Sequence, residues 1–291
     1  MTYDPLTSLA SLKAELESSW ALFDTIWKPF TAADWKRKFG KAWTYAEQPY
    51  HLAYFDGTLA KFLALGANAP ADRLHMKTFG DIHAWNAREF AARGPNHGIQ
   101  DTLAAMHKSR DDIRAQLSRM TEADLDAKAW MPLIFGWCTK RDLIQAIVVH
   151  NVAEYWKLWI RTGKKAPAPS PSAVHFRLSF MMKLMPASMN KTLAQKPFTM
   201  VWNFTGPGGG SWTFSVANGA CTVSESAAAS SDLSITMLPE NFHRIVAKMT
   251  PPPLLMLTGQ MKVKGLTKMA RFGKLFPEPR PDQELSGALI G

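Results

Sequence analysis

The sequence of 291 residues is long enough for about two domains, each able to bury its own hydrophobic core. Apolar residues make up 46% and charged residues 20%, as in an ordinary globular protein, and no run of 18 apolar residues indicates a membrane span. The two cysteines, Cys138 and Cys221, form no CxxC pattern, which argues against a disulfide framework and against a thiolate zinc site.

The net charge of +10 is spread over the whole chain, and residues 173–291 hold 12 Lys and Arg against 6 Asp and Glu. No nucleic-acid-reading module accompanies these charges, so nucleic acid is not an expected partner. Transient contact with an anionic membrane surface and a generally solvated surface both fit the charge. The N-terminal segment is too polar and acidic for a signal peptide, and we therefore expect a cytoplasmic protein.

Amphipathic helical patterns fill the first half of the chain. We expect helices at residues 11–28, 31–40, 48–66, 78–92 and 97–120, followed by a connection rich in Trp, Met and Pro at 121–138 and a last helix at 139–162. Four of these helices are long, and their varied connections indicate a helical bundle. Such bundles place ligand and metal sites inward from facing helices.

The helix at 139–162 carries residues able to do chemistry. Thr139 is its expected N-cap and Gly163 its C′ residue. His150 and Glu154 are four positions apart, so they share one helix face and could chelate a divalent ion with a third ligand from another helix. A hydrogen bond within the helix, or a buried histidine satisfied by a neighbour, would explain the same spacing. His51 stands near the start of the helix at 48–66.

The character of the sequence changes at residue 164. Residues 164–172, KKAPAPSPS, have the composition of a stiff, solvated linker, which predicts domains at 1–163 and 173–291. Beyond the linker we expect strands at 198–204, 212–216, 220–224, 233–237 and 261–263, with a hairpin turn at Asn218-Gly219. Helices are expected at 173–193, 239–249, 254–259 and 266–276.

The segments PFTMVWNFTGPGGGSWTFSVANGACTVSE, SDLSITMLPENFHRIV and PPLLMLTGQMKVKGLTKMARFGKLF resemble the sterol-carrier-protein family over residues 174–277. The resemblance implies an α+β domain whose sheet and helices enclose an apolar tunnel for a fatty acyl chain or a sterol-like ligand. Methionines and leucines suit ligands of varied shape, although each could equally fill core. The residues expected to line this lipid pocket are Met181, Met185, Trp202, Trp212, Leu255, Met256 and Met269.

Residues 10–162 resemble the DinB-like four-helix bundles, a superfamily that includes maleylpyruvate isomerase and thiol transferases. Its members typically bind a divalent metal through one histidine of the second long helix and an H-x-x-x-H pair on the last. The resemblance implies a Zn or Ni site at His51, His150 and Glu154, with Glu154 standing where a histidine is more usual. It also implies a low-molecular-weight thiol as cofactor, whose pKa a bound metal would lower.

The fold class expected is therefore multidomain: an all-α DinB-like bundle followed by an α+β sterol-carrier-like domain. Three functions fit this expectation. The first is a metal-dependent transferase or isomerase that uses a thiol and a hydrophobic electrophile. The second is a non-catalytic lipid carrier with a degenerate bundle, and the third is a structural or oligomerising protein. Expected partners are a hydrophobic small molecule or lipid and a second copy of the chain in a homodimer.

Overall fold

The computed structural model describes residues 3–40, 43–93 and 98–284, which form two compact units. The helical unit holds Leu6–Ala168, together with residues 280–284 of the described chain. The second unit holds Pro169–Pro279 and residues 3–5. Among the described helices, none has the length and apolar character that crossing a membrane requires.

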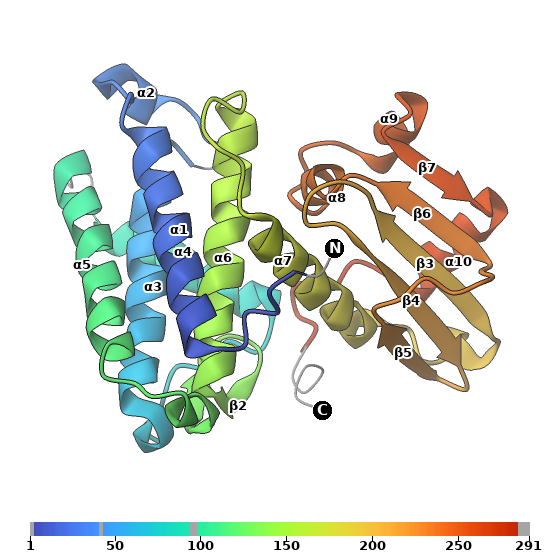
Figure 1. Cartoon of the computed structure of the whole chain (residues 1–291), viewed down its shortest axis with the longest axis horizontal. Coiled ribbons are helices and arrows are strands. Elements are labelled where there is room, and N and C mark those ends of the chain that lie inside the picture. Colours follow the sequence, from blue (N-terminus) through green and yellow to red (C-terminus); the bar gives the residue numbers. More distant parts are fainter. Residues whose placement is uncertain (1–2, 41–42, 94–97, 285–291) are drawn as a thin grey trace. The chain divides into compact units, whose positions relative to one another are not determined.

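Four long helices form the bundle of the helical unit: α1 (Leu9–Trp27), α3 (Glu47–Leu65), α5 (Ile99–Leu117) and α6 (Lys140–Arg161) (Figure 1). Helix α3 packs against α5 and α6, and α1 packs against α6. The expected four long helices are confirmed, with ends within three residues of the prediction. The expected start of the third one at His97 lies outside the described residues.

Shorter elements connect the long helices. They are α2 (Ala32–Lys36), α4 (Phe79–Arg93) and the 3₁₀ turns η1 (Gly66–Asn68) and η2 (Ala123–Asp126). The segment at 121–138, expected to be a plain connection, also contains an antiparallel hairpin of β1 (Lys128–Met131) and β2 (Gly136–Thr139). Three successive residues of β1 are buried, and in β2 the small residues Gly136 and Cys138 are buried while Trp137 is half-buried, so no polar–apolar alternation marks these short strands in the sequence.

The start of α6 is fixed by a capping box. The Thr139 hydroxyl accepts a hydrogen bond from the Asp142 backbone N–H at 3.1 Å, and the Asp142 carboxylate accepts one from the Thr139 N–H at 2.8 Å. Gly163 follows the helix with φ of +76°, as a C′ residue does. The expected ends of this helix are confirmed, and they determine which residues α6 turns inward.

The bundle core is built from the apolar stripes of its four long helices. Fully buried members include Leu12, Leu16, Phe23, Leu52, Leu59, Leu63, Ile113, Leu143, Ile147 and Leu158. This core fixes the rotation of α3 and α6 and thereby the direction of the polar side chains between them.

The second unit is a five-stranded sheet with helices, in the strand order β5-β4-β3-β6-β7. Its strands are β3 (Phe198–Phe204), β4 (Gly210–Ala217), β5 (Ala220–Ser224), β6 (Leu233–Met237) and β7 (Met261–Lys264), and only the neighbours β3 and β6 among these are parallel. Its helices are α7 (Pro171–Leu184), α8 (Pro239–Val246), α9 (Pro252–Leu257) and α10 (Met269–Leu275), with 3₁₀ turns η3 (Met185–Ser188), η4 (Leu193–Gln195) and η5 (Leu266–Lys268).

One face of this sheet carries an aromatic cluster. Trp202 of β3 lies directly opposite Trp212 of β4, and Phe204, two residues along β3, shares their face. Phe242 of α8 lies 5.4 Å from Trp202, and Phe272 of α10 lies 6.0 Å from it, measured between ring centroids. Helices α8 and α10 therefore cover this face, which forms the core of the unit.

Candidate metal site

The three predicted metal ligands come together between α3 and α6. His51 is in the second turn of α3, whereas His150 and Glu154 follow one another along α6. One ligand atom from each of the three lies within 4.8 Å of the other two, and the Nε2 atoms of His51 and His150 are 2.9 Å apart. The structure thus unites a pair predicted from its spacing with a histidine 99 positions earlier in the chain.

Aromatic side chains surround the two imidazoles. The ring of Phe55, one turn after His51 on α3, stacks on His150 with 3.4 Å between centroids and 11° between planes. Trp43 lies 4.9 Å from the ring of His51, and Phe90 of α4 lies 4.8 Å from Trp43. His51 is buried and His150 is half-buried, so the cluster is screened from bulk water without being sealed.

The protonation states of the cluster suit a cation. Burial lowers the pKa of His51 to about 4, which leaves its imidazole neutral near pH 7. Burial alone would raise the pKa of Glu154, but Lys157, His51 and His150 outweigh it and hold this pKa below its ordinary value. A neutral imidazole and an ionised carboxylate are the forms in which these side chains bind metals.

Two neighbours hold the Glu154 carboxylate. Gln48, three residues before His51, donates its amide Nε2–H to Glu154 Oε2 at 2.8 Å, and the Lys157 ammonium forms an ion pair with Oε1. The buried Oε1 of Gln48 has no hydrogen-bond partner among the described residues. The ion pair and the Gln48 hydrogen bond satisfy the carboxylate with protein groups alone.

Two further hydrogen bonds connect His51 to α4. Its Nδ1 lies 2.6 Å from the Tyr54 hydroxyl, and that hydroxyl donates to Asn86 Oδ1 of α4 at 2.8 Å. The position of Tyr54 three residues after His51 could have suggested the first contact. No sequence signal places Asn86, because α4 approaches the site only through the tertiary fold.

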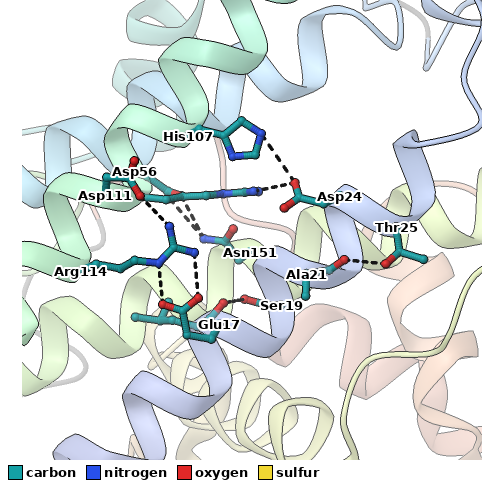
Figure 2. A network of polar contacts seen from close by, with 12 residues as sticks. Glu17, Ser19, Ala21, Asp24, Thr25, Asp56, His107, Asp111, Arg114 and Asn151 are labelled. Atoms are coloured by element: carbon teal, nitrogen blue, oxygen red, sulfur yellow. Dashed lines mark hydrogen bonds and ion pairs between the residues drawn. The ribbon is translucent and has the colours of Figure 1, made fainter.

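Asn151, next to His150, turns away from the cluster into the bundle core. Its Nδ2 donates to Asp56 Oδ1 at 3.2 Å (Figure 2) and to the Ile147 carbonyl at 3.0 Å. Both Asn151 and Asp56 are completely buried. The structure therefore assigns Asn151 to the core.

The residues present fit a divalent ion by their chemistry. Two imidazole nitrogens and one carboxylate form a donor set found in catalytic zinc sites, where a fourth position stays open for water or substrate. An approach of 2.9 Å between two Nε2 atoms requires either a shared hydrogen or a cation that both nitrogens bind from one side. Neutral His51 and ionised Glu154 supply lone pairs to such a cation.

The residues predicted for a lipid pocket are distributed through the second unit. Trp202 and Trp212 are buried and lie opposite each other on the covered face of the sheet. Leu255 of α9 is also buried, with 2% of its surface exposed. The methionines of the prediction are half-buried: Met181, Met185, Met256 and Met269.

A hollow of ≈ 270 Å³ in this unit has a different lining. The described residues around it belong to η4 and α10, and the seven predicted pocket residues are not among them: Leu193, Ala270, Arg271, Lys274 and Leu275. The residues predicted for a lipid pocket therefore do not line this hollow.

Comparison with known proteins identifies both units. Residues 15–171 match the DinB superfamily, and because this match spans more than half of the chain, the protein belongs to that superfamily. Residues 182–276 match the SCP-2 sterol transfer family. Both resemblances expected from the sequence are confirmed, and so is the multidomain fold class. No curated protein matches the sequence.

Among solved structures, the mycothiol-dependent maleylpyruvate isomerase is similar over almost the whole chain. Its structure aligns with a TM-score of 0.52 and 10% sequence identity, covering 92% of this chain and 96% of that one. A point mutant of the same enzyme aligns with a TM-score of 0.51 at the same identity and coverage. At this identity the likeness establishes a shared fold.

Proposed function

We propose that the helical unit binds one divalent ion, zinc or nickel, through His51, His150 and Glu154 and uses it in a thiol-dependent transferase or isomerase reaction. The observation that carries this proposal is the convergence of the three donor atoms within 4.8 Å from two helices. The DinB superfamily membership and the fold shared with a mycothiol-dependent isomerase support it.

A bound divalent ion would supply Lewis-acid stabilisation of a thiolate, which makes a low-molecular-weight thiol a nucleophile at neutral pH. In the reaction, the thiol loses its S–H proton to water, and its sulfur forms a bond to the electrophilic carbon of an α,β-unsaturated carbonyl substrate. The carbon–carbon π bond breaks, and its electron pair moves to the carbonyl as an enolate. The enolate re-forms the double bond with expulsion of the thiolate in isomerisation, or takes up a proton from water in transfer. Isomerisation would end with release of the same thiol, and transfer would retain the new bond. The low dielectric of the aromatic surroundings strengthens electrostatic interactions at the cluster.

The substrate proposed is a hydrophobic electrophile. The ring of Phe90 lies 4.8 Å from Trp43 and 5.9 Å from Tyr54, and the rings of Trp43 and Tyr54 lie 4.9 and 5.1 Å from the imidazole of His51. Such a wall favours apolar or aromatic groups over hydrated ones. The sterol-carrier-like unit would bind a hydrophobic substrate or lipid under its aromatic cluster.

The ion pair between Lys157 and Glu154 favours a second candidate, a non-catalytic lipid carrier with no metal in its bundle. In that protein the three side chains would be a polar core cluster and the sterol-carrier-like unit would carry the function. The two candidates differ in one measurable property, the stoichiometric binding of a divalent ion.

The test is the metal content of the purified full-length protein, measured by mass spectrometry after reconstitution with Zn²⁺ or Ni²⁺ and dialysis. We expect about one ion per chain, lost in His150→Ala and retained in His107→Ala, which removes an exposed histidine of α5. Absence of metal from the reconstituted wild type would refute the metal-dependent reaction. Native mass spectrometry of the same samples then tests whether a lipid co-purifies, as the carrier function requires.

A further inference from the structure

The side of His51 away from His150 is held by a chain of two polar residues. The Tyr54 hydroxyl lies 2.6 Å from His51 Nδ1 and 2.8 Å from Asn86 Oδ1. Tyr54 comes from the next turn of α3, whereas Asn86 comes from α4. The polar groups thus form a line from α4 to Nδ1 of His51, and the Nε2 of the same imidazole lies in the cluster beside His150.

The direction of these hydrogen bonds follows from their chemistry. A tyrosine hydroxyl has one hydrogen to donate, and the amide oxygen of Asn86 can only accept. The Tyr54 hydrogen is therefore directed to Asn86, and its oxygen accepts from His51, which must carry a hydrogen on Nδ1. A neutral imidazole has one N–H, so its Nε2 then holds a lone pair.

We propose that Tyr54 and Asn86 are positioning residues that hold His51 in the Nδ1–H tautomer and so present its Nε2 lone pair to a divalent ion. This inference rests on the proposed function for the identity of the ligand. The tautomer itself is a property of the protein, and it can be measured whether or not a metal binds.

Packing makes the line of hydrogen bonds rigid. The ring of Tyr54 lies 5.1 Å from Trp85 and 5.9 Å from Phe90, both edge-to-face, so α4 encloses it on two sides. A tyrosine hydroxyl, with an ordinary pKa of about 10, carries its hydrogen near neutral pH. Partners of this kind hydrogen-bond the ring nitrogen of a ligating histidine that does not bind the metal. Removing them typically weakens metal affinity by about 10- to 100-fold.

The tautomer is measured by ¹⁵N NMR of the imidazoles in the chelator-treated full-length protein. Wild type should show His51 with a hydrogen on Nδ1 and none on Nε2. Tyr54→Phe removes the acceptor oxygen, and the population should move toward Nε2–H. The matched control is Tyr50→Phe, one turn earlier on the same helix, whose lost hydroxyl donates to the Glu89 carbonyl. This control should leave the His51 signals unchanged.

Asn86→Ala provides a second variant that leaves the phenol in place. Without the Asn86 acceptor, Tyr54 can turn its hydrogen toward His51 Nδ1, so a mixture of the two tautomers is expected. Circular dichroism and thermal unfolding identify any variant that fails to fold, and the wild-type spectrum tests the inference even then. A wild-type His51 with its hydrogen on Nε2 would overturn the proposal.

Zinc affinity, measured by competition with a chromophoric chelator, is the second readout. We expect binding to weaken about 10- to 100-fold in Tyr54→Phe and to stay unchanged in Tyr50→Phe. If wild type binds no zinc yet shows the Nδ1–H tautomer, the proposed function fails and the positioning of His51 stands. If wild type binds zinc and Tyr54→Phe matches it in both affinity and tautomer, the positioning role is wrong.

Discussion

The buried Asp56 should make the stability of the helical unit depend on pH, and Asp56→Asn should remove that dependence. Burial raises the pKa of Asp56 from 3.8 to about 7, and attraction by Arg110 and the hydrogen bond from Asn151 offset only part of this effect. Arg110 has its own partner, since it donates to Asp24 at 3.0 Å. Asparagine copies the shape and the neutral charge of the protonated carboxyl.

The sign of the effect follows from proton linkage. Between pH 3.8 and about 7, folded Asp56 keeps a proton that the unfolded chain has lost. The free energy of unfolding contributed by this group is therefore largest below pH 3.8 and falls as the pH rises to about 7. At about 1.4 kcal/mol for each pH unit, the loss is on the order of 4 kcal/mol. Asp56→Asn should thus gain up to this amount over wild type above pH 7 and almost nothing near pH 4.

Urea unfolding of both proteins between pH 4.5 and 8, followed by far-UV circular dichroism, measures this difference. The matched control is Asp112→Asn, which changes an exposed aspartate of α5 paired with Lys108 and should shift stability by less than about 1 kcal/mol at every pH. A stability difference between Asp56→Asn and wild type that does not change with pH would refute the reasoning. So would a destabilised Asp56→Asn at pH 8.

Three further outcomes follow from contacts of single residues. Lys157→Met removes the cation paired with buried Glu154, so the metal-free protein should lose about 3–5 kcal/mol of unfolding free energy. In thermal scans, added Zn²⁺ should raise the Tm of this variant more than that of wild type. Gly265→Ala should lower the free energy of unfolding more than Gly259→Ala, although both glycines have φ near +75°. Of these two positions, Gly265 is the one where the new Cβ would meet a backbone oxygen, at 2.1 Å. Equal losses of stability in urea unfolding would contradict this. Thr139→Ala removes the cap of α6 and should cost about 1 kcal/mol, whereas Thr139→Ser should cost little.

The sequence predicted most of the fold because the helices and strands carry strong local signals. Strand β3 runs over 198–204 and β6 over 233–237, the ranges expected from alternation, and α6 begins at its capping box. The hairpin of β1 and β2 escaped prediction because the apolar residues of its two four-residue strands do not alternate with polar ones. Local pattern is thus informative where a capping box or a regular alternation marks the element.

The candidate site was predictable only in part, for a related reason. The spacing of His150 and Glu154 is a local property of one helix, and the resemblance to a known superfamily added His51. Gln48 bonds to Glu154, which is 106 positions later in the chain, and Asn86 bonds to Tyr54, which is 32 positions earlier. Both hydrogen bonds depend on how the helices are rotated against each other. Rotation is set by the whole core, so these partners became visible only in the folded structure.

The ion pair of Lys157 with Glu154 bears on how metal binding and folding are coupled. An unpaired buried carboxylate costs several kcal/mol, so this position needs a positive neighbour whether or not a divalent ion binds. Lys157 is such a neighbour, and its side chain is one-third exposed, so it can turn to solvent when an ion takes the carboxylate. The bundle core does not depend on the cluster, because four long helices bury it independently. Removing the metal should therefore abolish the proposed chemistry while leaving the bundle folded, and a chelator-treated protein that unfolds at room temperature would contradict this.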